Sequence, residues 1–286
     1  MPQAREISRV YSSRETLEGA GVRLHRAFGY SQIPLFDPFL MLDDFRAERP
    51  EDYLAGFPWH PHRGIETVTY MLEGKVEHGD SMGHAGSVEA GGIQWMTAGS
   101  GIIHQEMPKP VHGRMGGFQL WVNLPRSHKM MDPRYQETGA GEIPRVTLPG
   151  GAEVRVICGN AGGVAGPVRD IVAEPEYFDV TLGPGTQFSH PVRPGFLAAV
   201  YVIGGSGIFD PHGNVEQKDR TMALYGDKGT SVEVNAGDRG TRFLYFSGKR
   251  FREPIAWGGP IVMNTEEELQ QAFAEYRNGT FVRKRE

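Results

Sequence analysis

The sequence predicts an all-β fold of two antiparallel β-barrels of the jelly-roll type, followed by one short helix. Short segments in which apolar and polar residues alternate recur along the chain, which is the period of a β-strand. The 39 Gly and 20 Pro residues stand mostly between these segments, where they indicate turns. TVTYMLEG in the first half and AAVYVIGG in the second half form a weak internal repeat, which favours two similar domains.

The composition is that of a globular protein with a small excess of acid. The 286 residues carry 30 Lys and Arg against 35 Asp and Glu, for a formal net charge of −5. A nucleic-acid-binding surface normally appears as a basic domain or stripe, so we expect no direct nucleic-acid partner. The N-terminal segment lacks the apolar core of a signal peptide, and no apolar run approaches the ~20 residues of a membrane span. We therefore expect a soluble cytoplasmic protein without a membrane partner.

A single cysteine, Cys158, excludes a disulfide within one chain and fits a reducing compartment. It follows a strand-like run of Val and Ile, so we predict a buried, inert thiol.

The first half of the chain shows strand-like segments and no helical period. The segments are 39–45, 66–72, 75–80, 93–99, 102–107 and 118–124. A closed antiparallel sheet is the economical arrangement for them, because closure hides the strand edges. Residues 79–88 are predicted to be a Gly-rich connection between strands. A charged, Pro-punctuated stretch at 124–146 marks the boundary, so we predict an N-terminal domain over residues 1–135 and a C-terminal domain over residues 136–286.

The second half repeats the strand pattern and then ends in a helix. Its predicted strands are 153–159, 177–185, 198–209, 221–226, 230–238 and 242–248. Only His190 stands where the first half has a histidine pair, so we expect metal ligands in the N-terminal domain alone. Asn264 with Glu267 resembles a capping box at a helix start, and Gly279 suits its end. We expect this helix to pack on the face of a barrel.

Two pairs of side chains in the first half have the spacing of metal ligands. His60 and His62 are two residues apart, and so are His104 and Glu106. Residues two apart in a strand point to the same face, so two neighbouring strands would aim three imidazoles and one carboxylate at one interior point. That ligand set suits a borderline transition metal such as iron, nickel, copper, zinc or manganese.

Residues beside these four have predicted supporting roles. Arg63 is predicted to close an ion pair at the surface or rim. Glu66 lies four residues after His62, so on a regular strand it would be either an extra ligand or, as we favour, an acceptor that holds an imidazole tautomer. Gly99 and Gly101 would allow the sharp turn that precedes the second ligand pair.

These residues resemble the pirin family of the cupin superfamily. The matching segments are DPFLMLDDF, HPHRGIETVTYMLEG, GGIQWMTAGSGIIHQEM, GFQLWVNLP and WGGPIVMNTEEELQQAFAEY, which are spread over most of the chain. The resemblance implies a bicupin, two β-barrels with a metal only in the N-terminal one. It also implies His60, His62, His104 and Glu106 as ligands of Fe(II), or otherwise of Ni, Co, Cu, Mn or Zn.

The resemblance further implies a quercetin 2,3-dioxygenase, which opens a flavonol ring with dioxygen and releases carbon monoxide. The flavonol would bind through its 3-hydroxyl oxygen, and Glu106 would be the catalytic residue that accepts its proton. Aromatic and apolar residues near the ligands are candidate pocket walls: Phe57, Trp59, Ile65, Met96 and Ile103. We expect the protein to act as a monomer.

Two other functions stay open at the level of sequence. The resemblance also fits a metal-binding, redox-responsive regulatory protein that acts through a protein partner, as a transcriptional co-regulator or a modulator of a metabolic enzyme. The third alternative is a metal-stabilised barrel that has lost its activity.

Overall fold

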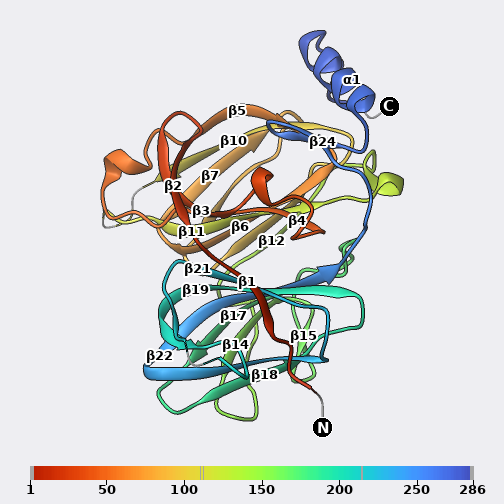
Figure 1. Ribbon diagram of the computed structural model, residues 1–286. Helices are drawn as coiled ribbons and strands as arrows, with labels where there is room; N and C mark the ends of the chain where they lie inside the picture. Colours follow the sequence, from red (N-terminus) through yellow and green to blue (C-terminus); the bar gives the residue numbers. More distant parts are fainter. Residues whose placement is uncertain (1–2, 110, 112, 214, 284–286) are drawn as a thin grey trace. The chain divides into compact units, whose positions relative to one another are not determined.

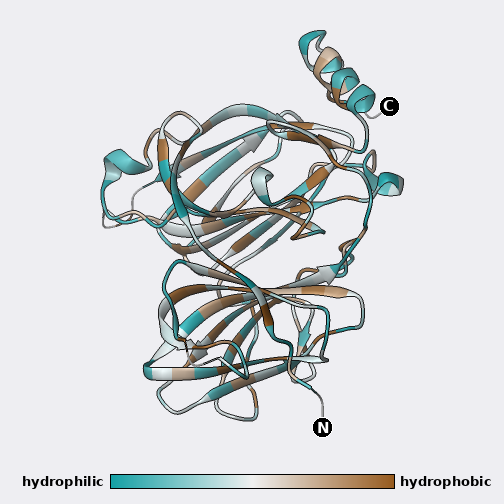
Figure 2. Ribbon diagram, viewed as in Figure 1, coloured by the Kyte–Doolittle hydropathy of each residue, from teal (hydrophilic) through white to brown (hydrophobic). Residues whose placement is uncertain are grey.

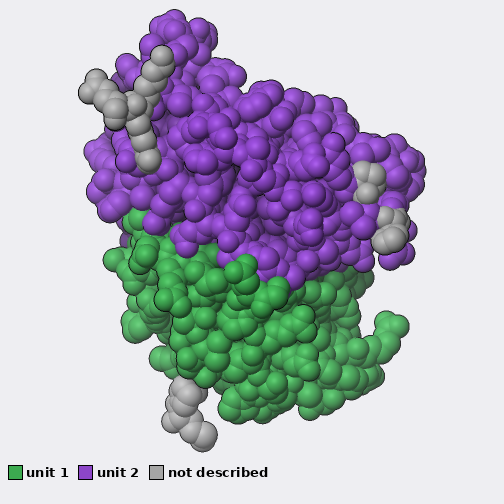
Figure 3. Space-filling view, turned by 180° about the vertical axis from the view of Figure 1, so that it is seen from behind, with its two compact units in different colours: residues 1–14, 36–38, 141–250 green, residues 15–35, 39–140, 251–286 purple. Residues whose placement is uncertain are grey.

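The chain folds into two compact units built almost entirely from β-strands, so the predicted all-β fold is confirmed. The computed structural model describes residues 3–109, 111, 113–213 and 215–283. Figure 3 colours unit 1 (1–14, 36–38 and 141–250) and unit 2 (15–35, 39–140 and 251–286) separately.

These units differ from the predicted domains 1–135 and 136–286 at both ends of the chain. Strand β1 (Ile7–Ser12) pairs with β21 (Thr221–Tyr225), so the N-terminal segment belongs to the sheet of the second half. The C-terminal segment instead joins unit 2, where Arg63 and Ile261 form a parallel bridge. A boundary drawn along the sequence assumes that each domain is one continuous segment, and strand exchange at the termini breaks that assumption.

Unit 2 contains a seven-stranded sheet, β12-β9-β6-β11-β4-β3-β2, and a four-stranded sheet, β5-β10-β7-β8. Its strands are β2 Arg14–Glu18, β3 Val22–Phe28, β4 Phe39–Asp44, β5 Phe57–His62, β6 Ile65–Glu73, β7 Lys75–Asp80, β8 Ala85–Glu89, β9 Ile93–Thr97, β10 Ile102–Lys109, β11 Gly116–Asn123, β12 Arg134–Thr138, β23 Ala256–Gly258 and β24 Ile261–Met263. Its short 3-10 turns are Tyr30–Gln32, Pro50–Asp52 and Arg126–His128. The paired β5, β10 and β7 run side by side in Figure 1.

Three details of the predicted strands were wrong. The supposed connection at 79–88 contains β8, which pairs with β7. The supposed linker at 124–146 contains β12, which extends the seven-stranded sheet by pairing with β9. The segments 230–238 and 242–248 form one long strand, β22 (Ser231–Lys249), with a register shift against β19 near Gly240, whose φ is +79°.

Unit 1 has a nine-stranded sheet in which β22 is central. The other strands of this sheet are β1, β13 Arg145–Thr147, β14 Glu153–Cys158, β17 Glu176–Leu182, β18 Gln187–Pro191, β19 Phe196–Ile208, β20 Gln217–Lys218 and β21. Strands β15 (Asn160–Ala161) and β16 (Val164–Ala165) pair with each other in a separate two-stranded sheet. Strands β17, β19 and β21 are buried over most of their length, and Figure 2 colours them by hydropathy. The predicted burial of the free thiol of Cys158 is confirmed.

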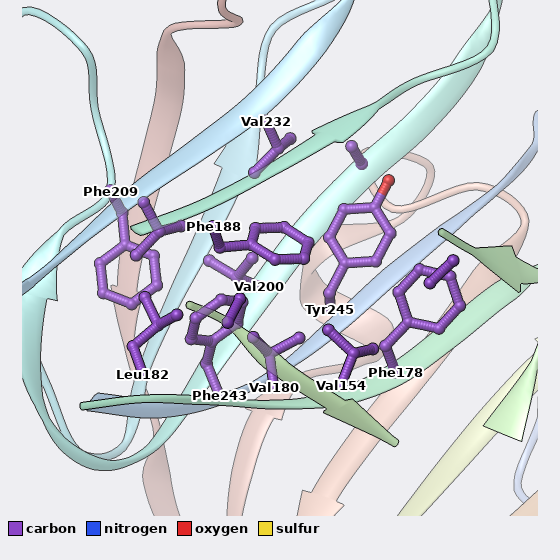
Figure 4. Packing of buried hydrophobic residues seen from close by; sticks show 14 of the residues in the cluster. Val154, Phe178, Val180, Leu182, Phe188, Val200, Phe209, Val232, Phe243 and Tyr245 are labelled. Atoms are coloured by element: carbon purple, nitrogen blue, oxygen red, sulfur yellow. The ribbon is translucent and has the colours of Figure 1, made fainter. Parts of the chain in front are cut away.

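Packed side chains fill the interior of unit 1. Phe178, Phe188 and Tyr245 lie close together there, with ring centroids 5.4–5.8 Å apart where they meet Tyr245 (Figure 4). His190 is buried among these rings, and its Nε2 lies 3.0 Å from a carboxylate oxygen of Glu176. The lone histidine of the second half is therefore a hydrogen-bonded core residue.

The predicted C-terminal helix exists as α1 (Glu266–Arg277), with its cap one residue later than expected. The Thr265 hydroxyl accepts a hydrogen bond from the Glu268 backbone N–H at 3.2 Å, and the Glu268 carboxylate accepts one from the Thr265 N–H at 3.0 Å. Asn264 instead uses its side-chain amide to donate to Glu253. The helix packs on β23 and β24, and no helix in the described ranges is long and apolar enough to cross a membrane.

Candidate metal centre

Three of the four predicted ligands meet inside unit 2. Strands β5 and β10 are neighbours, and His104 stands directly opposite His60 in their register. One ring nitrogen from each of His60, His62 and His104 lies within 4.8 Å of the others. The two Nε2 atoms of His60 and His62 are only 3.1 Å apart. The sequence spacing therefore placed the imidazoles correctly.

Backbone carbonyls determine the tautomers of two imidazoles. Nδ1 of His60 lies 2.8 Å from the Pro58 oxygen, and Nδ1 of His62 lies 2.9 Å from the Pro260 oxygen. A carbonyl oxygen only accepts hydrogen bonds, so each Nδ1 carries a proton and each ring turns its Nε2 toward the other. Two Nε2 atoms at this distance need a shared proton or a cation between them.

The third imidazole has no hydrogen bond of its own. His104 is buried, and neither ring nitrogen has a partner among the residues that the structure describes. Burial, reinforced by the neighbouring imidazoles, lowers the pKa of His62 to about 3 and the pKa of His104 well below its ordinary value. Both rings are therefore neutral at physiological pH, which is the form that binds a metal.

The spacing of these donors fits a transition metal ion. Two nitrogens that each lie ~2.1 Å from one ion, at right angles, are ~3.0 Å apart. The observed 3.1 Å between the Nε2 atoms matches this value. Orphaned, buried and neutral imidazole nitrogens are costly to maintain in a protein interior, and metal binding removes that cost.

Glu106, the fourth predicted ligand, lies beside this cluster without joining it. Its carboxylate lines the same cavity as His60 and His62 but falls outside the three-histidine group. It accepts hydrogen bonds from the Thr69 hydroxyl at 2.9 Å and from the Gln119 amide at 3.5 Å. A register shift between His104 and Glu106 against β5 accounts for the offset. Its role as a ligand remains a prediction.

Arg63 forms the predicted ion pair, but in the interior instead of at the surface. Its guanidinium is 2% exposed and lies 2.6 Å from the Glu275 carboxylate of α1. It also donates to the backbone oxygens of Ser100 at 2.7 Å and Phe281 at 2.8 Å, and it stacks on the Phe281 ring. Arg63 thus ties the C-terminal segment to the strand connection that follows His62.

Glu66 occupies neither of its predicted roles. The extended strand breaks at Gly64, which has a φ of +77°, so the parity counted from His62 does not continue into β6. Glu66 pairs with Thr97 in register and accepts a hydrogen bond from its hydroxyl at 2.7 Å. It therefore lies on the face of β6 opposite to Thr69, away from the imidazoles.

Glu66 also makes stability depend on pH. Burial raises its pKa from 4.5 to about 7, although the hydrogen bond from Thr97 acts in the opposite direction. The folded state then binds the Glu66 proton more tightly than the unfolded state does. The resulting contribution to the free energy of unfolding is complete below pH ~4.5 and is lost as the pH rises through 7. We expect Glu66→Gln to stabilise the protein at pH 8 by up to ~3 kcal/mol more than at pH 5, measured by urea unfolding. An equal effect of the substitution at both pH values would contradict this assignment.

The histidine cluster opens on a cavity of about 690 Å³ in unit 2. Of the predicted walls, Phe57 and Trp59 line it, whereas Ile65, Met96 and Ile103 pack elsewhere in the core. The sequence reading missed its other aromatic and polar walls. These are Tyr30, Phe45, Trp121 and Trp257 together with Glu18, Arg26, Asp43, Thr69 and Gln119.

An aromatic series leads from the cluster toward solvent. The rings of His62 and Trp121 lie 5.1 Å apart, Trp121 and Trp257 lie 5.8 Å apart, and Trp257 and Tyr30 lie 5.7 Å apart. The alternation of side chains along β11 could have indicated that Trp121 lines the cavity, because Trp121 lies on the same face of the strand as Gln119. Nothing in the local sequence of Trp257 indicated the cavity, because tertiary folding brings it there.

This fold and site define a class: a bicupin with a histidine cluster at an aromatic cavity in one of its barrels. The profile of the pirin family matches residues 21–122, and that of the pirin C-terminal cupin domain matches residues 177–282. The chain therefore belongs to the pirin family.

Relatives match nearly the whole chain. It is 45% identical to the pirin-like protein of Caulobacter vibrioides, over 97% of this chain and 99% of that one. It is 41% identical to human pirin, over 97% of this chain and 94% of that one. Among solved structures, the quercetin 2,3-dioxygenase of Acinetobacter baumannii matches with a TM-score of 0.88 and 31% identity, over 98% of this chain and 99% of that one.

Proposed function

We propose that this protein is a metal-dependent dioxygenase that cleaves a flavonol ring with dioxygen and releases carbon monoxide. The observation that carries the proposal is the cluster of three imidazoles, two of which, His60 and His62, line a cavity with aromatic walls. The similarity to a quercetin 2,3-dioxygenase supports the same substrate class. A flat aromatic ligand suits the cavity, since Trp59, Trp121 and Trp257 line it.

His60, His62 and His104 would hold the metal, with Glu106 as the proposed fourth ligand. Fe(II) is the ion we expect. Ni, Co, Cu, Mn or Zn would also accept this donor set. When bound, the ion supplies Lewis acidity that makes the flavonol 3-hydroxyl more acidic.

Glu106 is the proton acceptor in this proposal. Its carboxylate lines the cavity at the histidine cluster, so a ligand hydroxyl placed there lies within reach. The Thr69 hydroxyl and the Gln119 amide hold the carboxylate in place. Removing the proton makes the flavonol electron-rich, which prepares it for reaction with dioxygen, while the apolar walls exclude water.

The test is the loss of quercetin absorbance in air and under nitrogen with metal-loaded protein. We expect turnover only in air, and we expect Glu106→Gln to lower it by on the order of 100-fold or more. Glu77→Gln, an exposed carboxylate on neighbouring β7, is the matched control and should keep full activity. If no flavonol is consumed in air with any of the six metals, the proposal is wrong.

One observation favours a second function, a metal-responsive regulator that acts through a protein partner. Tyr30 and Trp59 line the cavity and yet are 68% and 53% exposed, and Trp59 is next to His60 in sequence. Exposed aromatic side chains are common at protein interfaces. Pull-down with metal-loaded and metal-free protein tests this alternative, which fails if no protein is retained differently by the two forms.

A further inference from the structure

A row of polar side chains crosses the interior face of the seven-stranded sheet in unit 2. Register places Arg26 beside Asp43, Asp43 beside Gln119, and Gln119 beside Thr69 on four adjacent strands. Side chains that are register neighbours share one face of a sheet, and all four line the cavity. The Thr69 end of the row bonds to Glu106, so one end lies at the proposed metal centre.

The other end of the row is an ion pair in the cavity wall. Arg26 donates from Nε and Nη2 to the two carboxylate oxygens of Asp43, at 2.8 and 2.7 Å. It also lies 2.8 Å from Glu18. Asp43 is 3% exposed, and burial raises its pKa to about 6 against the effect of Arg26. Each carboxylate oxygen can accept two hydrogen bonds, so the bidentate pair leaves Asp43 able to accept more.

The next residue offers a comparison. Asp44 is equally buried and makes a bidentate pair with Arg46, at 2.8 and 2.6 Å. It points to the opposite face of β4 and does not line the cavity. A structural role explains the Asp44 pair. Asp43 differs because it lines the cavity, where hydroxyl donors from a ligand would complete its hydrogen bonds.

We propose that Asp43, held by Arg26, is a specificity subsite that accepts hydrogen bonds from the phenolic hydroxyls on the pendant ring of a polyhydroxylated flavonol. Asp43 lies two strands from Thr69, a separation of ~10 Å at the usual strand spacing. A three-ring ligand with its 3-hydroxyl at the histidine cluster can span that separation. This inference rests on the proposed function and adds which flavonols the cavity prefers.

The experiment measures anaerobic binding, so that no turnover occurs, by quenching of tryptophan fluorescence in the metal-loaded full chain. Three flavonols are compared, with two, one or no hydroxyls on the pendant ring. We expect affinity to fall along this series. Asp43→Asn should weaken binding of the dihydroxylated flavonol by about 10-fold to 100-fold and leave the unhydroxylated one within about twofold. Asp44→Asn is the matched control and should preserve the wild-type preference.

Each possible result of this experiment either supports the Asp43 subsite or overturns it. Equal affinity of the wild-type protein for all three flavonols overturns the subsite while the proposed function stands, and this comparison needs no substitution. Equal losses in Asp43→Asn and Asp44→Asn would make the Asp43 pair structural only, and the subsite would again be wrong. If none of the three flavonols binds the wild-type protein, the proposed function fails and the subsite fails with it.

Discussion

Replacing His104 by Ala is expected to abolish tight metal binding while leaving the barrel folded. Both of its ring nitrogens lack hydrogen-bond partners within the described part of the chain, so the substitution breaks no hydrogen bond there. Loss of a residue that hydrogen-bonds to a metal ligand typically lowers metal affinity by about 10-fold to 100-fold. Loss of the ligand itself should lower metal affinity further. Metal content per chain and competition titration with a chelator measure the effect.

Stability provides a second readout for this variant. A ligand that binds only the folded state raises the melting temperature, so added metal should stabilise the wild-type protein and not His104→Ala. The control is His212→Ala, at a side chain that is 71% exposed in unit 1, far along the chain from the cluster. Equal metal content in both variants would show that the three imidazoles are not a metal site.

Replacing Arg63 by Met is expected to destabilise the protein by about 3–5 kcal/mol, the usual cost of removing one partner from a buried ion pair. The substitution leaves Glu275 and the carbonyl oxygens of Ser100 and Phe281 without their donor. Because these contacts hold α1 and the residues after it, the backbone amides of α1 should also exchange hydrogen faster. Urea unfolding and hydrogen exchange measure the two effects.

The matched control for this prediction is Arg49→Met. Arg49 forms an ion pair with Asp52, but its side chain is 63% exposed. Exposed pairs contribute little because water and salt screen them, so no measurable change in the unfolding midpoint is expected. If Arg63→Met also left the unfolding midpoint unchanged, the stability of the C-terminal segment would not depend on the contacts of Arg63.

Much of the local structure could be predicted because strand alternation is a local property. The pattern of residues 66–72 predicted β6, and the two-residue spacing of His60 with His62 predicted that their rings would meet. Parity fails once the chain leaves the regular strand. That is why Glu66 was misplaced beyond the turn at Gly64.

The sequence by itself determined an all-β chain with two similar halves, the residues of the histidine cluster and the capped helix near its end. The strand period, the spacing of His60 with His62 and the helix cap each depend on residues within a few positions of one another, where periodicity and side-chain chemistry are sufficient. Only the tertiary structure decided which terminal segments join which unit. It also decided that Pro260 supplies the carbonyl for His62, and that Asp43, Trp121 and Trp257 meet at one cavity. These contacts join strands far apart in the chain, and backbone carbonyls carry no signature of residue type, so no local pattern could have predicted them.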